Sequence, residues 1–483
     1  MESRDELRGQ IERWRRGEAD VMVAHARGTR DVSPIYPRRD VGELLLDAAS
    51  DLEPHEASAC AAHLARAVAE RVLEDARDDL EDALSRRHAF GRETFAWRAL
   101  LAGVWQGAPG ERGRGLVEAA ERGAEAADAL WRDARRRSDR DAGRLLRELA
   151  FPPHADAGPD AEARRALASR VLDATDDALR AGLEDADAHE LAGLASALRR
   201  VELDPFVSPK TRFRRFGLRM TPLGYERVLD RTLRVDAGHR APWPAPRLAV
   251  RRAGQDLRLL PPRLDHGVLG EVAAAEVVGR AVALSFVSPG LPPALARPAV
   301  GSVARAFGAA FALQLGEEEE WRRQGLEPSH AEKVARHARF VWLLQLRLAA
   351  VGTLVRGLHD APEKPTGLLL ADVAPTPTID VDERVAELVE RAVGVATPVR
   401  LARALAWNPA GAGARLRAGV GSLAIWVAMR ERHDEDWYRN PRVEEGLRAA
   451  FERGGTFGVE GWCEELGATE DDAFARLRER FSR

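Results

Sequence analysis

The sequence predicts a mainly α-helical protein, and three observations support this fold class. Leu, Val and Ala recur at spacings of three and four residues over most of the chain, which is the period of an amphipathic helix. The composition, with 45% hydrophobic residues, is that of a folded globular protein. Only one stretch has the pattern of β-strands around a turn, so we expect a single small β-hairpin.

The helical period is clearest on either side of the proline-containing loops. Residues 44–84 alternate charged and apolar side chains as two successive amphipathic helices would, and residues 114–149 repeat the pattern. The segment Phe151–Pro159 interrupts it, and Asp160 is a suitable N-cap for the next helix. The period resumes from about Val381 and continues to the end of the chain.

The β signal lies in a proline-rich stretch near the middle of the chain. Arg247–Arg251 and Leu257–Leu260 are two short apolar runs with Gly254 between them. Gly at such a position supplies the turn conformation that joins two antiparallel strands. We therefore expect a hairpin over residues 247–260.

The length of the chain predicts two domains. A chain of 483 residues exceeds the length of about 250–300 residues at which a single hydrophobic core stops growing. Because the composition changes shortly after residue 235, we expect an N-terminal helical lobe over residues 1–235 and a C-terminal helical lobe over residues 236–483.

Charge and cysteine usage exclude several classes of protein. The net charge of −4, with both signs interspersed, argues against a nucleic-acid partner. The charged N-terminus has no apolar signal segment, and no run of about 18 uncharged apolar residues predicts a membrane span. Two distant cysteines, Cys60 and Cys463, indicate a reducing compartment. We expect a cytoplasmic protein without a membrane association.

Two long apolar stretches, Val268–Leu284 and Val303–Leu315, predict a pair of buried helices. Gly279 and Gly308 lie within them, where the absence of a side chain would allow close contact between two helices. Neither stretch contains a histidine.

With their neighbours, these stretches resemble the oligoendopeptidase F and thimet oligopeptidase group of helical zinc peptidases. The order and spacing of several short segments carry the resemblance, none of which is specific alone: Gln255–Leu260, Glu276–Arg280, Phe307–Gly308, Phe340–Ala350, Asp436–Pro441, Gly454–Gly455 and Cys463–Gly467. The resemblance implies two helical lobes around a central groove, the zincin-like peptidase architecture. It also implies a zinc site on the two apolar helices.

The residues at the matched positions depart from zinc peptidase chemistry. Such a site needs a His-Glu-x-x-His helix, in which the two His bind zinc and the Glu is the general base, and a third ligand from another helix. Here Glu276 and Arg280 stand at the two His positions, Val277 at the base and Phe307 at the third ligand. His-Glu-x-x-His occurs nowhere in the sequence. The sequence therefore predicts no catalytic residue, no metal and no cofactor.

Other histidines offer no replacement site. His330, Glu332 and His337 fall on one expected helix, but seven residues separate the two histidines. That spacing corresponds to about 10.5 Å, which is too far for one metal ion. We expect this side of the helix to be a solvated polar surface.

Three hypotheses for the function remain. The first is a catalytically inactive metallopeptidase-like protein that binds an unidentified peptide or protein partner in the interlobe groove, with Glu271, Arg305 and Arg347 as possible binding residues. The second is an enzyme with an unrecognised non-zinc site in the same groove, such as acid–base chemistry by Glu271 or Glu276. The third is a helical scaffold unrelated to peptidases. Glu276 and Arg280 could form an ion pair one helical turn apart, or both could face solvent.

Overall fold

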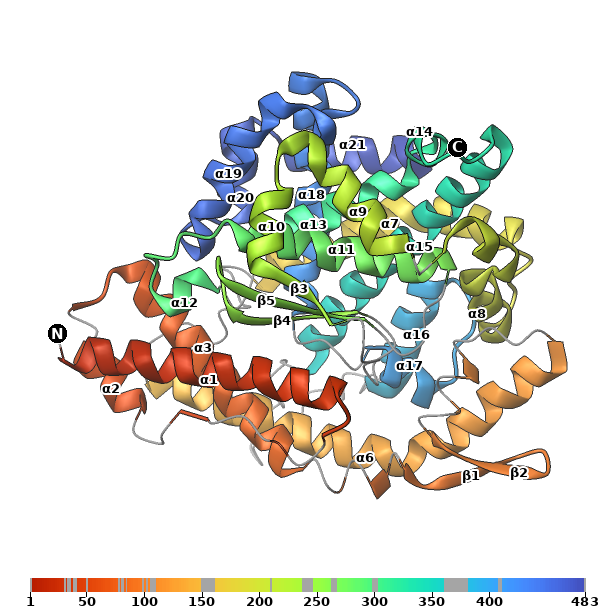
Figure 1. Ribbon diagram of the computed structural model, residues 1–483. Helices are drawn as coiled ribbons and strands as arrows, with labels where there is room; N and C mark the ends of the chain where they lie inside the picture. The colour runs from red at the N-terminus through yellow and green to blue at the C-terminus, as the bar shows by residue number, and fades with distance from the viewer. Residues whose placement is uncertain are drawn as a thin grey trace, which may run out of the picture.

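The computed structural model describes residues 2–481 with several gaps. The residues outside the described part are 1, 30–31, 33–35, 38–40, 49–50, 77–78, 80–81, 84, 98–99, 101–102, 105–109, 149–160, 209–210, 237–245, 262–266, 298–302, 360–380, 407–410 and 482–483. The predicted mainly α-helical fold is confirmed: helices form most of the described chain, and two small sheets accompany them (Figure 1).

The N-terminal part consists of long helices that pack side by side. Leu7, Ile11 and Trp14 are buried at helical spacing on the first helix, so one face of it faces the protein interior. Asp160, the predicted N-cap, lies outside the described residues, and α7 begins directly after it. The elements are α1 (Glu2–Ala26), α2 (Val41–Ala48), α3 (Pro54–Asp75), α6 (Gly110–Glu148), α7 (Ala161–Asp185), α8 (Leu191–Arg199), α9 (Arg212–Met220) and α10 (Glu226–Thr232), with 3-10 turns at Val201–Phe206 and Thr221–Leu223.

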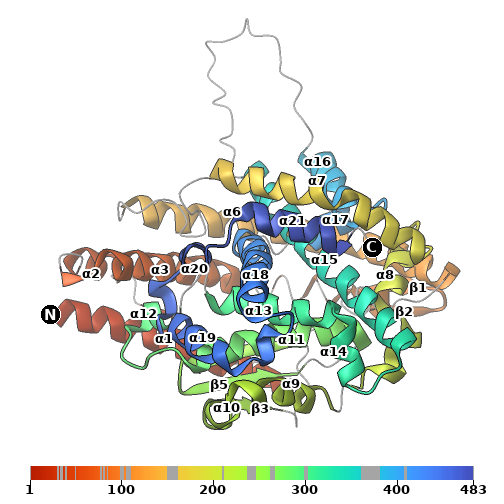
Figure 2. The ribbon, with the colours of Figure 1, turned by 90° about the horizontal axis from the view of Figure 1, so that it is seen from above.

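The C-terminal part is built around four buried helices, α11, α13, α15 and α18. In Figure 2, α18 lies near the middle of the molecule, and it packs against α13, α15, α20 and α21. The elements are α11 (Gly267–Ser285), α12 (Pro293–Ala296), α13 (Val303–Leu313), α14 (Glu318–Arg323), α15 (Pro328–His359), α16 (Val381–Val393), α17 (Val399–Ala406), α18 (Ala412–His433), α19 (Glu444–Glu452), α20 (Val459–Leu466) and α21 (Glu470–Phe481), with 3-10 turns at Gln314–Gly316, Trp437–Arg439, Pro441–Val443 and Gly454–Thr456.

The predicted hairpin is present as β4 (Arg247–Arg252) and β5 (Asp256–Leu260), which pair antiparallel. Gly254 has a φ of +71°, and a Cβ on it would lie 2.4 Å from the carbonyl oxygen of Val287, so only glycine fits this turn. The Gly254 N–H also donates to the carbonyl of Leu284 at 2.8 Å. The hairpin is therefore fixed to the C-terminal end of α11, and α1 covers β4 (Figure 1).

The expectation of a single hairpin was wrong in two respects. A second hairpin joins β1 (Arg87–Phe90) to β2 (Glu93–Ala96), with Gly91 at a φ of +61° in the turn. A third strand, β3 (Leu233–Val235), pairs parallel with β5. These strands are only three or four residues long, too short for alternation to stand out in the sequence.

The hydrophobic core is not divided at residue 235. The largest buried cluster extends from Leu100 to Leu477, and β3 joins the sheet of the C-terminal part across the expected boundary. A smaller buried cluster is formed by α1, α2 and α3 with Ala142 and Ala294. The separation into lobes at residues 1–235 and 236–483 stays a prediction.

One described helix is apolar and long enough to meet the criteria for a membrane span. It covers Pro328–Arg356 of α15, and 72% of its apolar window is buried inside the protein. The helix packs against α7, α16 and α18. Its apolar character is therefore explained by its position in the core of the fold.

Candidate functional site

The two apolar helices α11 and α13 make close contact at the predicted glycines. A Cβ on Gly279 would lie 2.8 Å from the Cα of Gly308 and 2.8 Å from the Cβ of Phe311. A Cβ on Gly308 would lie 2.5 Å from the carbonyl oxygen of Glu276 and 2.6 Å from the Cγ of Arg280. The predicted role of Gly279 and Gly308 is confirmed, because any larger residue would force the helices apart.

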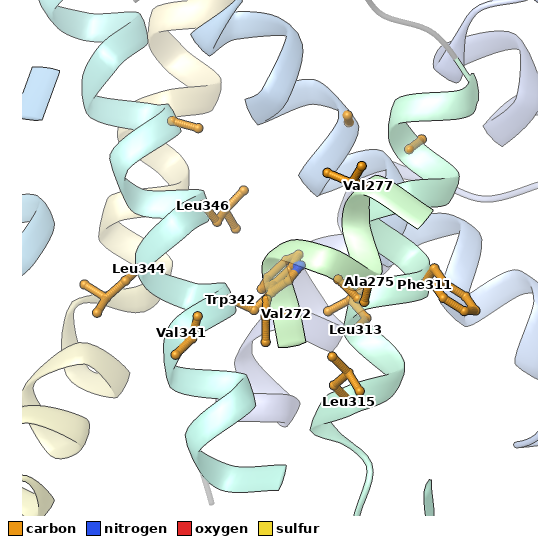
Figure 3. Close-up of a cluster of buried hydrophobic side chains, with 14 of the residues drawn as sticks. Val272, Ala275, Val277, Phe311, Leu313, Leu315, Val341, Trp342, Leu344 and Leu346 are labelled. Atoms are coloured by element: carbon orange, nitrogen blue, oxygen red, sulfur yellow. The ribbon is translucent and has the colours of Figure 1, made fainter. Parts of the chain in front are cut away.

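Val277, at the general-base position, belongs to the hydrophobic core. Its side chain is 9% exposed and lies in the buried cluster of Figure 3 with side chains of α13 and α15 such as Phe311 and Trp342. Valine has no group that can accept a proton, and Val277 packs in the hydrophobic core instead.

Arg280 is half-buried, and the charges of one carboxylate and two other arginines act on it. Burial lowers the pKa of its guanidinium, Glu276 opposes that effect, and Arg415 and Arg66 lower the pKa further. We call Arg66, Arg280 and Arg415 the arginine cluster. It brings together α3, α11 and α18. Because guanidinium groups stay protonated and have no lone pair for a metal, none of these three arginines can act as a metal ligand.

Two arrangements were predicted for Glu276 and Arg280, an ion pair or exposure of both side chains to solvent. Both side chains are half-buried, so neither arrangement describes them fully. They do not simply face solvent. The carboxylate acts on Arg280 through its charge, and no ion pair within 4.0 Å is found between these two described side chains.

Phe307 points into an aromatic cluster. It is 1% exposed, and its ring centroid lies 4.8 Å from that of Phe451 in α19 and 6.3 Å from that of Phe311. The backbone oxygen of Phe307 contacts the Gly279 side of α11, whereas Arg280 contacts Gly308. Phe307 therefore lies on the flank of α13 away from Arg280.

Arg305 is a second candidate for the third position, and the assignment of Phe307 to it stays a prediction. Residues three apart on a helix lie on the same face, so Arg305 shares the side of Gly308 that faces Arg280. Its side chain is half-buried. The sequence pattern favoured Phe307 because it directly precedes Gly308, and only the helix contact shows which flank each residue occupies.

Two of the residues expected to bind a ligand in the groove have structural partners instead. Glu271 is fully buried, and it accepts hydrogen bonds from Arg212 at 2.6 Å and from Arg215 at 2.8 Å. Glu271 thus links α11 to α9, and this corrects both its assignment to ligand binding and the hypothesis that it is an acid–base group.

Arg347 is also fully buried. It donates to the carbonyls of Ala392 at 2.9 Å and Leu172 at 3.0 Å, and to Asp176 at 2.7 Å. Burial alone would raise the pKa of Asp176, but hydrogen bonds from Arg391 and Arg347 lower it. Arg347 therefore fastens α15 to α7 and α16 and cannot reach a ligand in a groove.

The expected solvated surface around His330 and His337 was wrong for both histidines. His337 is 3% exposed, its Nε2 lies 3.1 Å from the carbonyl oxygen of Leu198, and burial lowers its pKa to about 4. His330 is half-buried and stacks on Phe206 with ring centroids 4.2 Å apart. Within the described part of the chain, no three His, Cys, Asp or Glu side chains are grouped so that they could hold a metal ion.

A charged cluster between α1 and α3 is marked by no local sequence pattern. Arg66 donates to Glu18 at 2.9 Å and to Glu70 at 2.6 Å, and Arg15 also pairs with Glu18. Burial raises the pKa of Glu70 to about 7. Burial would also raise the pKa of Glu18, but Arg15 and Arg66 lower it to about 2. The two carboxyls lie close enough to compete for one proton, and Glu70 holds it more strongly.

Comparisons with known proteins identify the fold. No protein-family model and no curated protein matches the sequence. A solved structure described as that of CHT aligns over 100% of both chains with a TM-score of 0.60 and 10% identity. A putative oligoendopeptidase F from Bacillus anthracis aligns over 98% of this chain and 84% of its own, with a TM-score of 0.52 and 10% identity.

The chain shares the fold of an oligoendopeptidase F. The resemblance inferred from the sequence is confirmed at the level of the fold, and identities of 10% carry it no further.

Proposed function

We propose that this protein is a catalytically inactive relative of the helical zinc peptidases that binds a peptide or protein segment between its two helical parts. The residues at the matched positions carry the proposal, because Arg280 cannot bind a metal ion and Val277 cannot accept a proton. Hydrolysis by a zinc peptidase requires a divalent cation with three protein ligands and an open fourth position. Here Arg280 stands at a matched ligand position, and the sequence contains no His-Glu-x-x-His motif.

We infer from helix spacing which residues replaced the zinc ligands. Glu276 and Arg280 occupy one face of α11, Arg280 contacts Gly308 of α13, and Arg305 lies three residues before Gly308. The base position, Val277, is part of the core. The departures thus remove both the metal and the group that would activate a water molecule, so no part of the mechanism remains.

A binding role in the cytoplasm is the simplest use of such a fold. The fold supports a peptide or protein partner only by analogy with oligopeptidases, since a shared fold does not define a function. The interspersed charges give no support for a nucleic-acid partner.

The proposal is tested by restoring a zinc site in two matched ways. The variant Glu276→His/Arg280→His/Arg305→Glu removes two positive charges and supplies two imidazoles and a carboxylate on facing helices. The control variant Glu276→His/Arg280→His/Phe307→Glu places the carboxylate on the opposite flank. We expect the first variant to bind one equivalent of zinc, measured by elemental analysis, and the second to bind much less.

Each outcome has a distinct meaning. One equivalent of zinc in the unmodified protein, or peptide hydrolysis that a chelator abolishes, would overturn the inactive-peptidase proposal. Zinc bound by the Phe307 variant alone would show that the third position was assigned to the wrong flank. If both variants fold, as judged by circular dichroism, and neither binds zinc, the helix pair does not correspond to a peptidase metal site.

A further inference from the structure

A pocket of about 330 Å³ opens between the N-terminal helix and the segment that follows α11. One wall is α1, and the other consists of the β4–β5 turn and residues 288–297. Its volume lies at the lower end of the range of about 300–1,000 Å³ that is typical of small-molecule sites. Because distant parts of the chain form its walls, no local sequence motif marks it.

Positive charge dominates the lining of this pocket. Five of its 14 lining residues are arginines, and only Asp5 and Glu12 are acidic. Both carboxylates already pair with arginines on their own helix, Asp5 with Arg8 at 3.9 Å and Glu12 with Arg16 at 3.2 Å. The acidic residues of the lining therefore do not neutralise the arginines across the pocket.

Three of the five arginines are matched by carboxylates of the protein. Arg8 binds Glu56, Arg15 binds Glu18, and Arg251 binds Asp20. The other two, Arg252 and Arg297, form no ion pair within 4.0 Å with any described carboxylate. These two arginines have no direct ion pair, although the charges of Glu18 and Glu70 act on Arg297 from a greater distance.

Arg297 is held in a position that favours an anion. Its Nη1 donates to the carbonyl oxygen of Arg15 at 2.7 Å, which fixes the guanidinium at the pocket wall. Burial lowers its pKa well below the usual value, and the charge of Arg15 lowers it further. A guanidinium nevertheless stays protonated, so Arg297 presents a fixed positive charge with which an anion in the pocket can pair. Nε of Arg15 is also buried without a hydrogen-bond partner among the described residues.

Backbone contacts hold the walls of the pocket in place. The Gly254 turn is hydrogen-bonded to the end of α11, and the Ser288 N–H donates to the carbonyl of Glu452 at 3.2 Å. His63 of α3 lies 3.2 Å from the carbonyl oxygen of Ala294 in α12, which anchors the helix that precedes Arg297. The arginines thus approach the cavity from fixed elements, as a preorganised site requires.

We propose that this pocket binds a small molecule carrying an oxyanion, a carboxylate or a phosphate, between Arg252 and Arg297. Planar guanidinium groups match both oxyanions with paired hydrogen bonds. Pro289, Leu291 and Pro293 line the other side and leave room for a small apolar group on the ligand. The proposal does not depend on the inactive-peptidase assignment, because the zinc variants alter α11 and α13 and leave the pocket lining intact.

The test is calorimetric titration of the folded full-length protein with inorganic phosphate and, separately, with citrate, at constant ionic strength. We expect saturable one-to-one binding of at least one probe, and the stronger probe identifies the preferred oxyanion. Arg252→Gln removes a side chain that is exposed and should weaken binding by about tenfold or more, as the loss of a charge-assisted hydrogen bond does. Arg297→Gln, checked for folding, should weaken it further.

A matched control separates a site from general electrostatics. Arg227→Gln removes the same charge from an exposed position on α10 that does not line the pocket, and it should leave the affinity unchanged. Equal weakening by Arg227→Gln and Arg252→Gln would overturn the proposal. So would the absence of saturable binding of either probe at millimolar concentration, or unchanged binding in Arg252→Gln.

Discussion

The contact between α11 and α13 depends on two glycines, and Gly308→Ala tests it most directly. The added methyl group would lie 2.5 Å from the carbonyl oxygen of Glu276 and 2.6 Å from the Cγ of Arg280, where ordinary contacts begin at about 3.4 Å. The Glu276 oxygen belongs to the backbone of a buried helix, so no rotation of a side chain can relieve that overlap. The helices must move apart or bend, and the packing of both into the core suffers.

Two opposing terms set the magnitude. Alanine is favoured over glycine inside a helix by about 1 kcal/mol. Overpacking a well-filled core costs about 1–3 kcal/mol, and a backbone contact places this case at the upper end. We therefore expect Gly308→Ala to lower the free energy of unfolding by about 1–2 kcal/mol. Gly279→Ala should have a similar effect, because its Cβ would lie 2.8 Å from the Cα of Gly308.

Gly446→Ala is the matched control. Gly446 is inside α19, and a Cβ there would meet nothing within 4 Å, so the substitution should stabilise the protein by up to about 1 kcal/mol. Denaturant unfolding followed by circular dichroism measures all three variants. The double variant Gly279→Ala/Gly308→Ala should lose less free energy of unfolding than the two single variants together, because both substitutions separate α11 and α13 at the same contact. A Gly308→Ala protein as stable as Gly446→Ala would refute the close contact.

Three further predictions concern buried charges. Glu271→Gln removes the buried carboxylate that pairs with Arg212 and Arg215, and it should lower the free energy of unfolding by about 3 kcal/mol. A loss below about 1 kcal/mol in urea denaturation would contradict this. The pKa of His337 is lowered to about 4, so its contribution is complete above the unfolded value of about 6.5 and is lost as the pH falls towards 4. This contribution to the free energy of unfolding is up to about 3 kcal/mol. In His337→Gln the free energy of unfolding should therefore depend less on pH between about 4 and 6.5. The pKa of Glu70 is raised to about 7, so its proton-linked stability is present below about 4.5 and lost as the pH rises through 7. At pH 8 Glu70→Gln should therefore be at least as stable as the natural protein, whereas Glu18→Gln should be less stable; thermal unfolding that ranks them the other way would show that Glu18 holds the proton.

Local patterns were enough for the helical elements. The spacing of apolar residues predicted α6 and α11 within a few residues of their ends, and Gly254 marked the turn of the β4–β5 hairpin. These features follow from interactions among residues close in sequence, which periodicity and turn chemistry express directly. Strands of three or four residues, such as β3, carry too few alternations to be recognised in this way.

The candidate site could be predicted only in part. The sequence by itself determined that no His-Glu-x-x-His motif is present and that Gly279 and Gly308 could bring two helices together. Only the tertiary structure showed that the Phe307 ring packs against Phe451, because the rotation of a helix depends on its packing partners.

The roles of the charged residues depended on the tertiary structure even more strongly. In the sequence Glu271 and Arg347 are a carboxylate and a guanidinium on apolar helices, which suggested binding of a ligand. The fold brings Arg212 to Glu271 from 59 residues away and Asp176 to Arg347 from 171 residues away. The arginine pocket has the same origin, since Arg252 and Arg297 meet α1 only after the chain has folded. A charge acts through whatever lies within a few ångströms of it, and folding alone decides those neighbours.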